Sequence, residues 1–208
     1  MKKILFLFLV VHSLLLHAQD DYISWSSFQL QTDLTDKSVL SVKPIFRHNE
    51  NLSRYQNMSV DIIFKQNLGK GWSGQLLSRS WFIPDSDYRH FIFFDIANTF
   101  GKNQTKVTNR LRYHWAFEIA GNTDLDFFRW ATNISFFNKK KLRPYVTIEP
   151  WLRADGIYQF QLIRYEPGIK WIFNEKLSLD FQYRIEKTIN REPDNQVNVF
   201  VINLLYKI

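Results

Sequence analysis

The sequence predicts an all-β protein, an antiparallel up-and-down transmembrane β-barrel of about 10–12 strands. Three observations predict it. Segments of roughly 10 to 12 residues alternate between apolar and polar side chains, which is the period of a strand with two different faces. The segments recur about every 17 residues, and bulky aromatic residues on one face oppose charged residues on the other, as in a barrel between lipid and water. A segment with the grammar of an export signal precedes them.

The export signal is predicted in residues 1–18. Lys2 and Lys3 give a positive start, an apolar run covers 4–16, and Ala18 is a small residue suited to cleavage. This run is too short to span a membrane as a helix, which needs roughly 20 apolar residues. Residues 19–208 are then about 190 residues long, which is compatible with a single barrel domain.

Composition narrows the class of protein further. The chain has no cysteine, so neither disulfides nor thiol chemistry contribute. Aromatic residues make up 17% of the chain although the mean hydropathy is −0.28, a combination that fits strands half in lipid and half in water. The net charge of +7 comes from basic residues scattered along the strands, and export removes the chain from nucleic acid, so nucleic-acid binding is not expected.

The predicted strands are justified one by one by the same alternation. They cover, in order, 22–32, 38–48, 57–66, 72–83, 90–100, 106–118, 128–137, 143–153, 162–173, 177–186 and 197–208. From the second strand onward, the apolar face is represented by Val42, Ile62, Leu76, Ile92, Leu111, Trp130, Ile148, Ile169, Phe181 and Ile202. Strands of this length exceed the usual 5 to 6 residues of soluble sheets, which favours a membrane barrel over a sandwich.

The connections alternate in length as well. Short turns are predicted near 33–37, 69–71, 101–103, 138–141 and 174–176, and longer polar loops near 49–56, 84–89, 120–126, 154–161 and 189–196. Short periplasmic turns and longer outer loops are typical of outer-membrane barrels.

The first strand raises a question of parity. The ten strands between residues 38 and 208 form a self-consistent even barrel, with the last strand ending on the periplasmic side. The segment 22–32 would then run downward from the outside, although a newly exported N-terminus starts in the periplasm. Either this segment is not a regular wall strand, or the number of strands is odd, or the count is wrong.

The polar faces are expected to point into the lumen and carry most of the charge. The positive candidates are Lys43, Arg47, Lys65, Arg79, Arg110, Arg112, Arg129, Arg153, Arg164, Lys170 and Arg184. The negative candidates are Asp61, Asp95, Glu118, Glu149, Glu166, Asp180 and Glu186. A barrel of this size has a narrow interior, and lone buried charges are costly. We therefore expect an interlocked ion-pair core, with a small pore or pocket for an anionic solute as the alternative.

Several short segments resemble the DUF2490 family. They are the start from Asp20 to Trp25, the segment from Asn109 to Tyr113, and the end, with Leu204, Tyr206 and Ile208. The resemblance covers the whole chain after the signal and rests on short aromatic motifs. It implies an exported outer-membrane barrel without an assigned function, and it supplies no catalytic residues.

Neither a catalytic site, a metal site nor a cofactor is predicted. His114 shares a face with Arg112 and Glu118, but no serine lies at a compelling spacing from it. His48 and His90 lie near loop ends, beside Ser53 and Ser86 respectively. The three histidines that follow the signal are scattered, and without cysteine they do not form a set of converging metal ligands.

The sequence therefore predicts a non-catalytic outer-membrane barrel of a Gram-negative cell, either structural or a narrow conduit or binding site for small solutes. Its expected partners are outer-membrane lipid, the barrel-assembly machinery during biogenesis, and a small anionic solute. Two alternatives stay open. One is a soluble periplasmic, lipocalin-like barrel with an apolar interior that binds an apolar ligand, and the other is an outer-membrane lipid-modifying enzyme.

Overall fold

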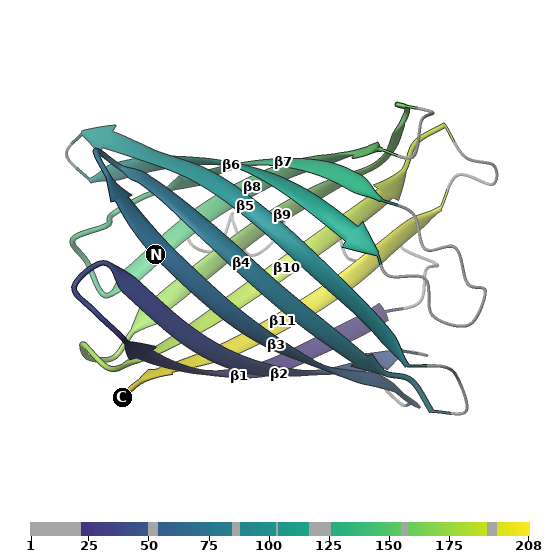
Figure 1. Cartoon of the computed structure of the whole chain (residues 1–208), viewed down its shortest axis with the longest axis horizontal. Helices are drawn as coiled ribbons and strands as arrows, with labels where there is room; N and C mark the ends of the chain where they lie inside the picture. The colour runs from purple at the N-terminus through teal and green to yellow at the C-terminus, as the bar shows by residue number, and fades with distance from the viewer. Residues whose placement is uncertain are drawn as a thin grey trace, which may run out of the picture.

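The structure is a closed barrel of tilted β-strands (Figure 1). It is a computed structural model that describes residues 22–49, 54–84, 88–102, 104–116, 126–154, 158–190 and 195–208. The predicted export signal, residues 1–18, lies outside the described residues. Within the described part no helix is long and apolar enough to cross a membrane, a finding that does not bear on strands.

The described residues form eleven strands, which lie close to the predicted segments. They are β1 (Tyr22–Asp33), β2 (Ser38–Asn49), β3 (Arg54–Gly69), β4 (Trp72–Phe82), β5 (Arg89–Lys102), β6 (Thr105–Ala116), β7 (Phe127–Ser135), β8 (Leu142–Arg153), β9 (Phe160–Ile172), β10 (Leu177–Thr188) and β11 (Gln196–Lys207). The prediction of an all-β barrel with about 10–12 strands is confirmed.

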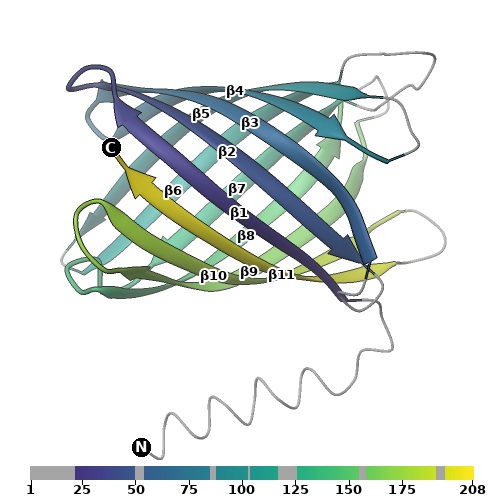
Figure 2. The same cartoon turned by 90° about the horizontal axis from the view of Figure 1, so that it is seen from below.

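The closure of the barrel answers the question of parity. β1 is a regular wall strand that pairs with β2 on one side and with β11 on the other. β1 and β11 run in the same direction (Figure 2) and pair in parallel from Tyr22 opposite Asn198 to Gln31 opposite Lys207. The expectation of an entirely antiparallel barrel is therefore wrong at this pair, because an up-and-down chain with an odd number of strands closes on one parallel pair.

Side chains and backbone both hold this closing pair together. Ser27 donates a hydrogen bond of 2.9 Å to the amide oxygen of Asn203 across the β1–β11 pair. At the end of the two strands, the Lys207 ammonium lies 2.6 Å from the Asp33 carboxylate. The backbone N–H of Ile208 donates to the carbonyl of Gln31 at 2.9 Å. The parallel pair is thus hydrogen-bonded along its length and ion-paired at its end.

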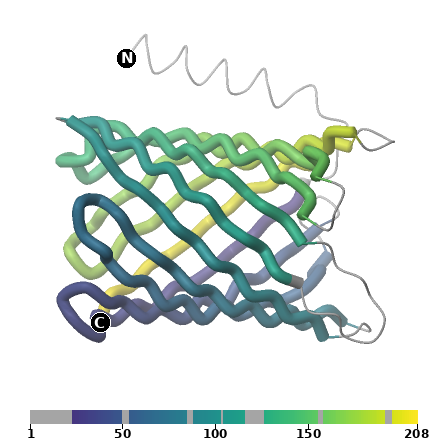
Figure 3. The backbone as a smooth tube through the Cα atoms, turned by 45° about the horizontal axis from the view of Figure 1, so that its top comes forward, coloured from purple at the N-terminus to yellow at the C-terminus, as the bar shows by residue number. Residues whose placement is uncertain are grey.

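The barrel has two different ends. We call turn end the one where residues 34–37, 70–71, 136–141 and 173–176 connect the strands, and loop end the opposite one. Figure 3 shows the C-terminus at the turn end. The tightest described turn needs glycine: Gly71 has φ of 81°, and the carbonyl oxygen of Thr99 occupies the space of any side chain there.

The two faces of the wall have opposite polarity. Large apolar side chains lie exposed on the outside; they include Ile62 (52%), Trp130 (59%) and Phe181 (45%). The inner face buries charged side chains such as Asp61 at 2% and Glu149 at 1% exposure. Apolar inward residues gather in one region, where Leu77, Phe91 and Phe93 pack together. The barrel is therefore apolar outside and largely ionic inside.

Candidate functional site

The lumen is filled with side chains in its middle and towards the loop end. Every strand from β2 to β11 contributes inward side chains that are under a tenth exposed, namely Arg47, Asp61, Leu77, Phe93, Arg112, Arg129, Glu149, Arg164, Arg184 and Val199. These residues meet in the interior of the barrel rather than on its surface. This level of the lumen is packed like a protein core, although most of its members are charged.

Glu149 is the centre of the ionic network. Its carboxylate accepts hydrogen bonds from Arg110 at 2.6 Å, Arg129 at 2.7 Å and Arg164 at 2.9 Å. The indole N–H of Trp151 donates to the same carboxylate at 3.0 Å. Only Arg164 is directly opposite Glu149 in the ladder; Arg110 and Arg129 reach it from β6 and β7. One carboxylate thus ties four strands together.

Two further arginines bind carboxylates in bidentate pairs. Arg79 donates to both oxygens of Asp61 at 2.6 and 2.7 Å, and Arg112 donates to both oxygens of Asp95 at 2.6 and 2.7 Å. Gln75 adds a hydrogen bond of 3.0 Å to Asp95. This planar two-point geometry is the strongest form of an arginine–carboxylate contact, since it satisfies both groups at once.

The network continues through β9 and β10 towards the loop end. Arg164 contacts Glu186 at 2.6 Å in addition to Glu149, and Arg184 contacts Glu166 at 2.5 Å. A longer contact of 3.7 Å joins Arg164 to Glu166. Because each guanidinium bridges more than one strand, the ion pairs restrain the shape of the barrel as well as neutralise buried charge.

Aromatic rings lie beneath the guanidinium groups. Arg47 and Arg184 lie over the ring of Trp25, with Cζ 4.5 and 4.4 Å from its centroid. Arg129 and Arg164 lie over Trp151 at 3.8 and 4.6 Å. The third ring, Phe93, lies under Arg79 and Arg112 at 5.4 and 4.9 Å. The faces of aromatic rings attract cations, more so where water is excluded, so these rings make close packing of arginines tolerable.

Arg47 is bound differently from the other arginines. It donates one hydrogen bond of 2.6 Å to the amide oxygen of Asn57 and also lies over Trp81 at 4.7 Å. Its Nε and Nη2 atoms are buried without a hydrogen-bond partner among the described residues. The stacking on Trp25 and Trp81 is therefore its main compensation for burial.

Most of the predicted lumen residues lie inside the barrel. Those that face the interior are Arg47, Arg79, Arg110, Arg112, Arg129, Glu149, Arg164, Glu166, Asp180, Arg184 and Glu186. Glu118 lies outside the described residues. Arg47 and Asp180 stand apart from the ion pairs, since they bind Asn57 and Tyr145 respectively. The positions of Trp25 and Trp151 beneath arginines were not predicted from the sequence, although both residues lie at inward positions of the alternation.

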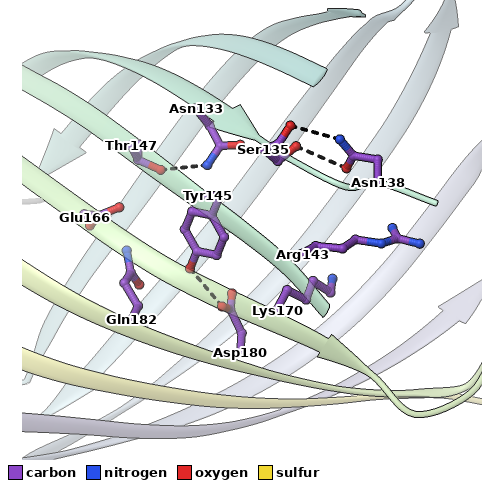
Figure 4. Close-up of a pocket in the computed structure, with 10 residues that line it drawn as sticks. All are labelled: Asn133, Ser135, Asn138, Arg143, Tyr145, Thr147, Glu166, Lys170, Asp180 and Gln182. Atoms are coloured by element: carbon purple, nitrogen blue, oxygen red, sulfur yellow. Dashed lines mark hydrogen bonds between the residues drawn. The ribbon is translucent and has the colours of Figure 1, made fainter. Parts of the chain in front are cut away.

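A cavity of about 390 Å³ lies in the lumen near the turn end, beside the filled region. Its lining residues come from β7 to β10 and the turn after β7 (Figure 4): Asn133, Ser135, Asn138, Arg143, Tyr145, Thr147, Glu166, Lys170, Asp180 and Gln182. Tyr145 lies at the centre of this group in the view, and its hydroxyl donates a hydrogen bond of 2.8 Å to Asp180. The interior thus has two parts, an ion-paired filling and a polar cavity.

Gly168 is what allows Tyr145 to lie across the wall of this cavity. The two residues are opposite each other in the β8–β9 ladder. A Cβ atom built at Gly168 would overlap the Cζ, Cε1 and hydroxyl oxygen of Tyr145, all at 2.8 Å or less. The phenol ring therefore occupies the space that a side chain at position 168 would need, and from there it reaches Asp180 on β10.

We expect Gly168→Ala to lower the free energy of unfolding by about 1–3 kcal/mol, the range of overpacking substitutions. The added methyl group must displace the Tyr145 ring and break its bond to Asp180. Urea unfolding followed by tryptophan fluorescence measures the effect. Gly74→Ala is the matched control, because the nearest atom to a Cβ there is 3.9 Å away. In a protein that already carries Tyr145→Ala, Gly168→Ala should cost little, because the ring it would displace is gone. Equal effects of Gly168→Ala and Gly74→Ala on stability would contradict the close contact between Gly168 and Tyr145.

His114 lies inward as predicted and packs among aromatic rings. Its ring centroid is 4.5 Å from that of Phe93, 5.1 Å from Phe91 and 6.0 Å from Phe127. Neither ring nitrogen has a hydrogen-bond partner among the described residues. In this environment His114 contributes to the filling of the lumen, and no described serine hydroxyl is bonded to it.

The serine neighbours of His90 differ from the one predicted from the sequence. Ser86 lies outside the described residues. Instead, Ser80 Oγ lies 3.3 Å from Nδ1 and Ser78 Oγ lies 3.4 Å from Nε2, because β4 and β5 pair with Ser80 opposite His90. The Tyr88 hydroxyl donates to Ser80 at 2.7 Å. β4 is paired on both sides, so the ladder uses the backbone amides that could otherwise stabilise an oxyanion.

Neither metal ligands nor similarity to known proteins assigns a function to the barrel. The described residues contain no group of three or more histidine and acidic side chains placed to hold a metal ion. Comparisons of the chain with models of protein families, with curated proteins and with solved structures give no match.

Proposed function

We propose that this chain is an outer-membrane β-barrel, exported by residues 1–18, whose apolar outer face lies in lipid. The observation that carries the proposal is the reversed polarity of the wall. Soluble proteins keep most charged side chains on the surface, whereas here Glu149 and Arg129 are buried and Phe94, Phe181 and Ile202 are 44 to 47% exposed on the outside. Hydrocarbon would cover these side chains and leave the ionic lumen shielded.

The ends of the strands support the same placement. Tryptophan and tyrosine side chains favour the interface between lipid and water. Trp72 and Trp171 lie exposed near the turn end, and Trp115 lies exposed near the loop end. With strands of mostly 11 to 14 residues between these levels, the wall is long enough for a tilted crossing of the hydrocarbon layer.

The filled lumen points to a barrel that does not conduct ions and does not catalyse a reaction. Its role is structural, combined with binding of a small solute at the turn end. The resemblance to the DUF2490 family is part of this proposal, because it implies the same architecture and localisation. Lipid and, during biogenesis, the barrel-assembly machinery are the partners such a barrel requires.

The two alternatives fit the interior less well. A lipocalin-like barrel needs an apolar interior for its ligand, and the described lumen is lined mainly by arginines and carboxylates. A lipid-modifying enzyme would use the Ser80–His90 contact on the outer face. That contact lacks free backbone amides to stabilise an oxyanion.

The purified protein, inserted into a planar bilayer, should give no ion-conducting steps, because side chains from β2 to β11 fill the middle of its lumen. Insertion is verified independently by flotation with lipid vesicles, and an open porin serves as the positive control for conductance. Regular conductance steps from the wild-type protein would contradict a closed lumen. A chain that stays folded in buffer without lipid or detergent would contradict the membrane placement, and phospholipid turnover lost in Ser80→Ala would favour the enzyme.

A further inference from the structure

We propose that the cavity at the turn end binds a small hydroxylated anion, such as a sugar acid or a sugar phosphate. This deepens the proposed function and rests on its closed lumen, which makes the cavity a pocket rather than a stretch of channel. Arg143 and Lys170 would bind the anionic group, and the amide and hydroxyl side chains around Tyr145 would bind the hydroxyl groups.

A pair of cations lies in the cavity wall. Arg143 on β8 and Lys170 on β9 are directly opposite each other in the ladder. Like charges directly opposite each other destabilise a sheet, and an anion bound between them would relieve the repulsion. Arg143 donates its Nε–H to the Lys140 carbonyl at 2.9 Å. Within the described residues, neither the Lys170 ammonium nor the terminal nitrogens of Arg143 form an ion pair or hydrogen bond.

The acidic residues of the cavity are already engaged. Asp180 is opposite Lys170 on the other side of β9, but one of its carboxylate oxygens accepts the hydrogen bond from Tyr145 at 2.8 Å and no ion pair joins it to Lys170 in the described part of the chain. Glu166 binds Arg184 at 2.5 Å. Arg143 and Lys170 therefore have no carboxylate partner among the described residues, whereas in the filled region most arginines contact one. The Arg143 and Lys170 side chains are therefore the groups left to pair with an incoming anion.

The rest of the cavity wall carries mostly amide and hydroxyl side chains. Asn133 donates to the Thr147 hydroxyl at 2.8 Å, and Ser135 donates to the amide oxygen of Asn138 at 3.2 Å, so these residues form an ordered set of amides and hydroxyls on one side (Figure 4). Gln182 lines the opposite side, and its side chain makes no hydrogen bond to the described residues. Neutral groups that both donate and accept hydrogen bonds suit the hydroxyls of a small polyol.

The Tyr145 ring gives the cavity an aromatic surface. It lies against the backbone at Gly168 and is held in place by its bond to Asp180. A fixed aromatic ring in a polar cavity gives an apolar surface for the C–H groups of a sugar ring. A volume of about 390 Å³ is within the usual size of small-molecule pockets and accommodates one such molecule.

The test is calorimetric titration of the full-length protein in detergent micelles, in a buffer free of phosphate. The probes are glucuronate, glucose 6-phosphate, neutral glucose and inorganic phosphate. We expect both sugar anions to bind, and glucose and inorganic phosphate to bind at least tenfold more weakly. The two anions distinguish a carboxylate ligand from a phosphate ligand.

Variants locate the site. Lys170→Gln and Arg143→Gln should each weaken binding of the sugar anions about tenfold or more. Lys65→Gln removes the same charge from the inner face of β3, outside the cavity lining, and should leave binding unchanged.

Three results would overturn the proposal: no sugar anion binds, glucose binds as tightly as glucuronate, or Lys65→Gln and Lys170→Gln have equal effects. Each variant is also tested for insertion and for absence of conductance. A barrel that inserts and stays closed but binds no anion refutes only the ligand site, whereas conductance by the wild-type protein refutes the closed lumen itself.

Discussion

Glu149→Gln should lower the free energy of unfolding by about 3–5 kcal/mol, the cost of removing one partner from a buried ion pair. The substitution keeps the shape of the side chain and removes the carboxylate that Arg110, Arg129 and Arg164 share, of which Arg164 alone keeps a second close carboxylate, Glu186. Arg129 and Arg164 are about 7% exposed, so water does not replace the lost carboxylate. The amide also presents N–H groups to guanidinium donors that need acceptors. Urea unfolding in lipid vesicles measures the change.

The matched control for this prediction is Glu175→Gln in the turn between β9 and β10, where the side chain is exposed. Surface substitutions of this kind usually change stability by less than about 0.5 kcal/mol. A loss below about 1 kcal/mol for Glu149→Gln would mean that the three arginines do not depend on this carboxylate, and the network would need another source of negative charge.

Phe181→Arg should cost about 2–4 kcal/mol more than Gln182→Arg, since a cation at the middle of the bilayer is penalised by that amount on the lipid face of a barrel. Phe181 is central in β10, opposite Ile169 and Ile202, and is 45% exposed on the outside. Gln182 is the next residue, points inward and lines the cavity. The comparison therefore differs mainly in which face carries the charge.

Unfolding in vesicles of defined hydrocarbon thickness measures both variants. Ile202→Arg with Asn203→Arg repeats the comparison on β11, where Ile202 is 44% exposed outside and Asn203 accepts a hydrogen bond from Ser27 inside. Equal penalties on the two faces would argue against lipid around the outer face, and with it against the proposed localisation.

Much of the fold could be predicted from the sequence because membrane-barrel strands carry a local signal. The alternation of Leu179, Phe181 and Tyr183 with Asp180 and Gln182 fixes which side chains share a face. The register in which strands meet is a long-range property. This is why the alternation identified β1 as a candidate strand but left its partner, β11, undecided.

The interior was predictable in its composition and less so in its contacts. Inward parity identified Arg129 and Glu149, but three arginines converge on one carboxylate only when β6 to β9 are aligned as they are. The cavity was harder still, since it depends on the absence of a side chain at Gly168 and on the position of the Tyr145 ring. The alternation of apolar and polar residues does not indicate that the space beside Gly168 is filled by the ring of Tyr145.

Because the number of strands is odd, the start of β1 and the end of β11 lie at opposite ends of the barrel. β1 starts at the loop end, and β11 finishes beside the turn between β9 and β10, where the backbone N–H of Lys207 donates to the Lys176 carbonyl at 2.7 Å. Epitopes fused ahead of Tyr22 and behind Ile208 would emerge on opposite sides of a bilayer. In a barrel with an even number of strands, both epitopes would lie on the same side. Antibody binding to each epitope in sealed vesicles therefore shows whether the number of strands is odd or even.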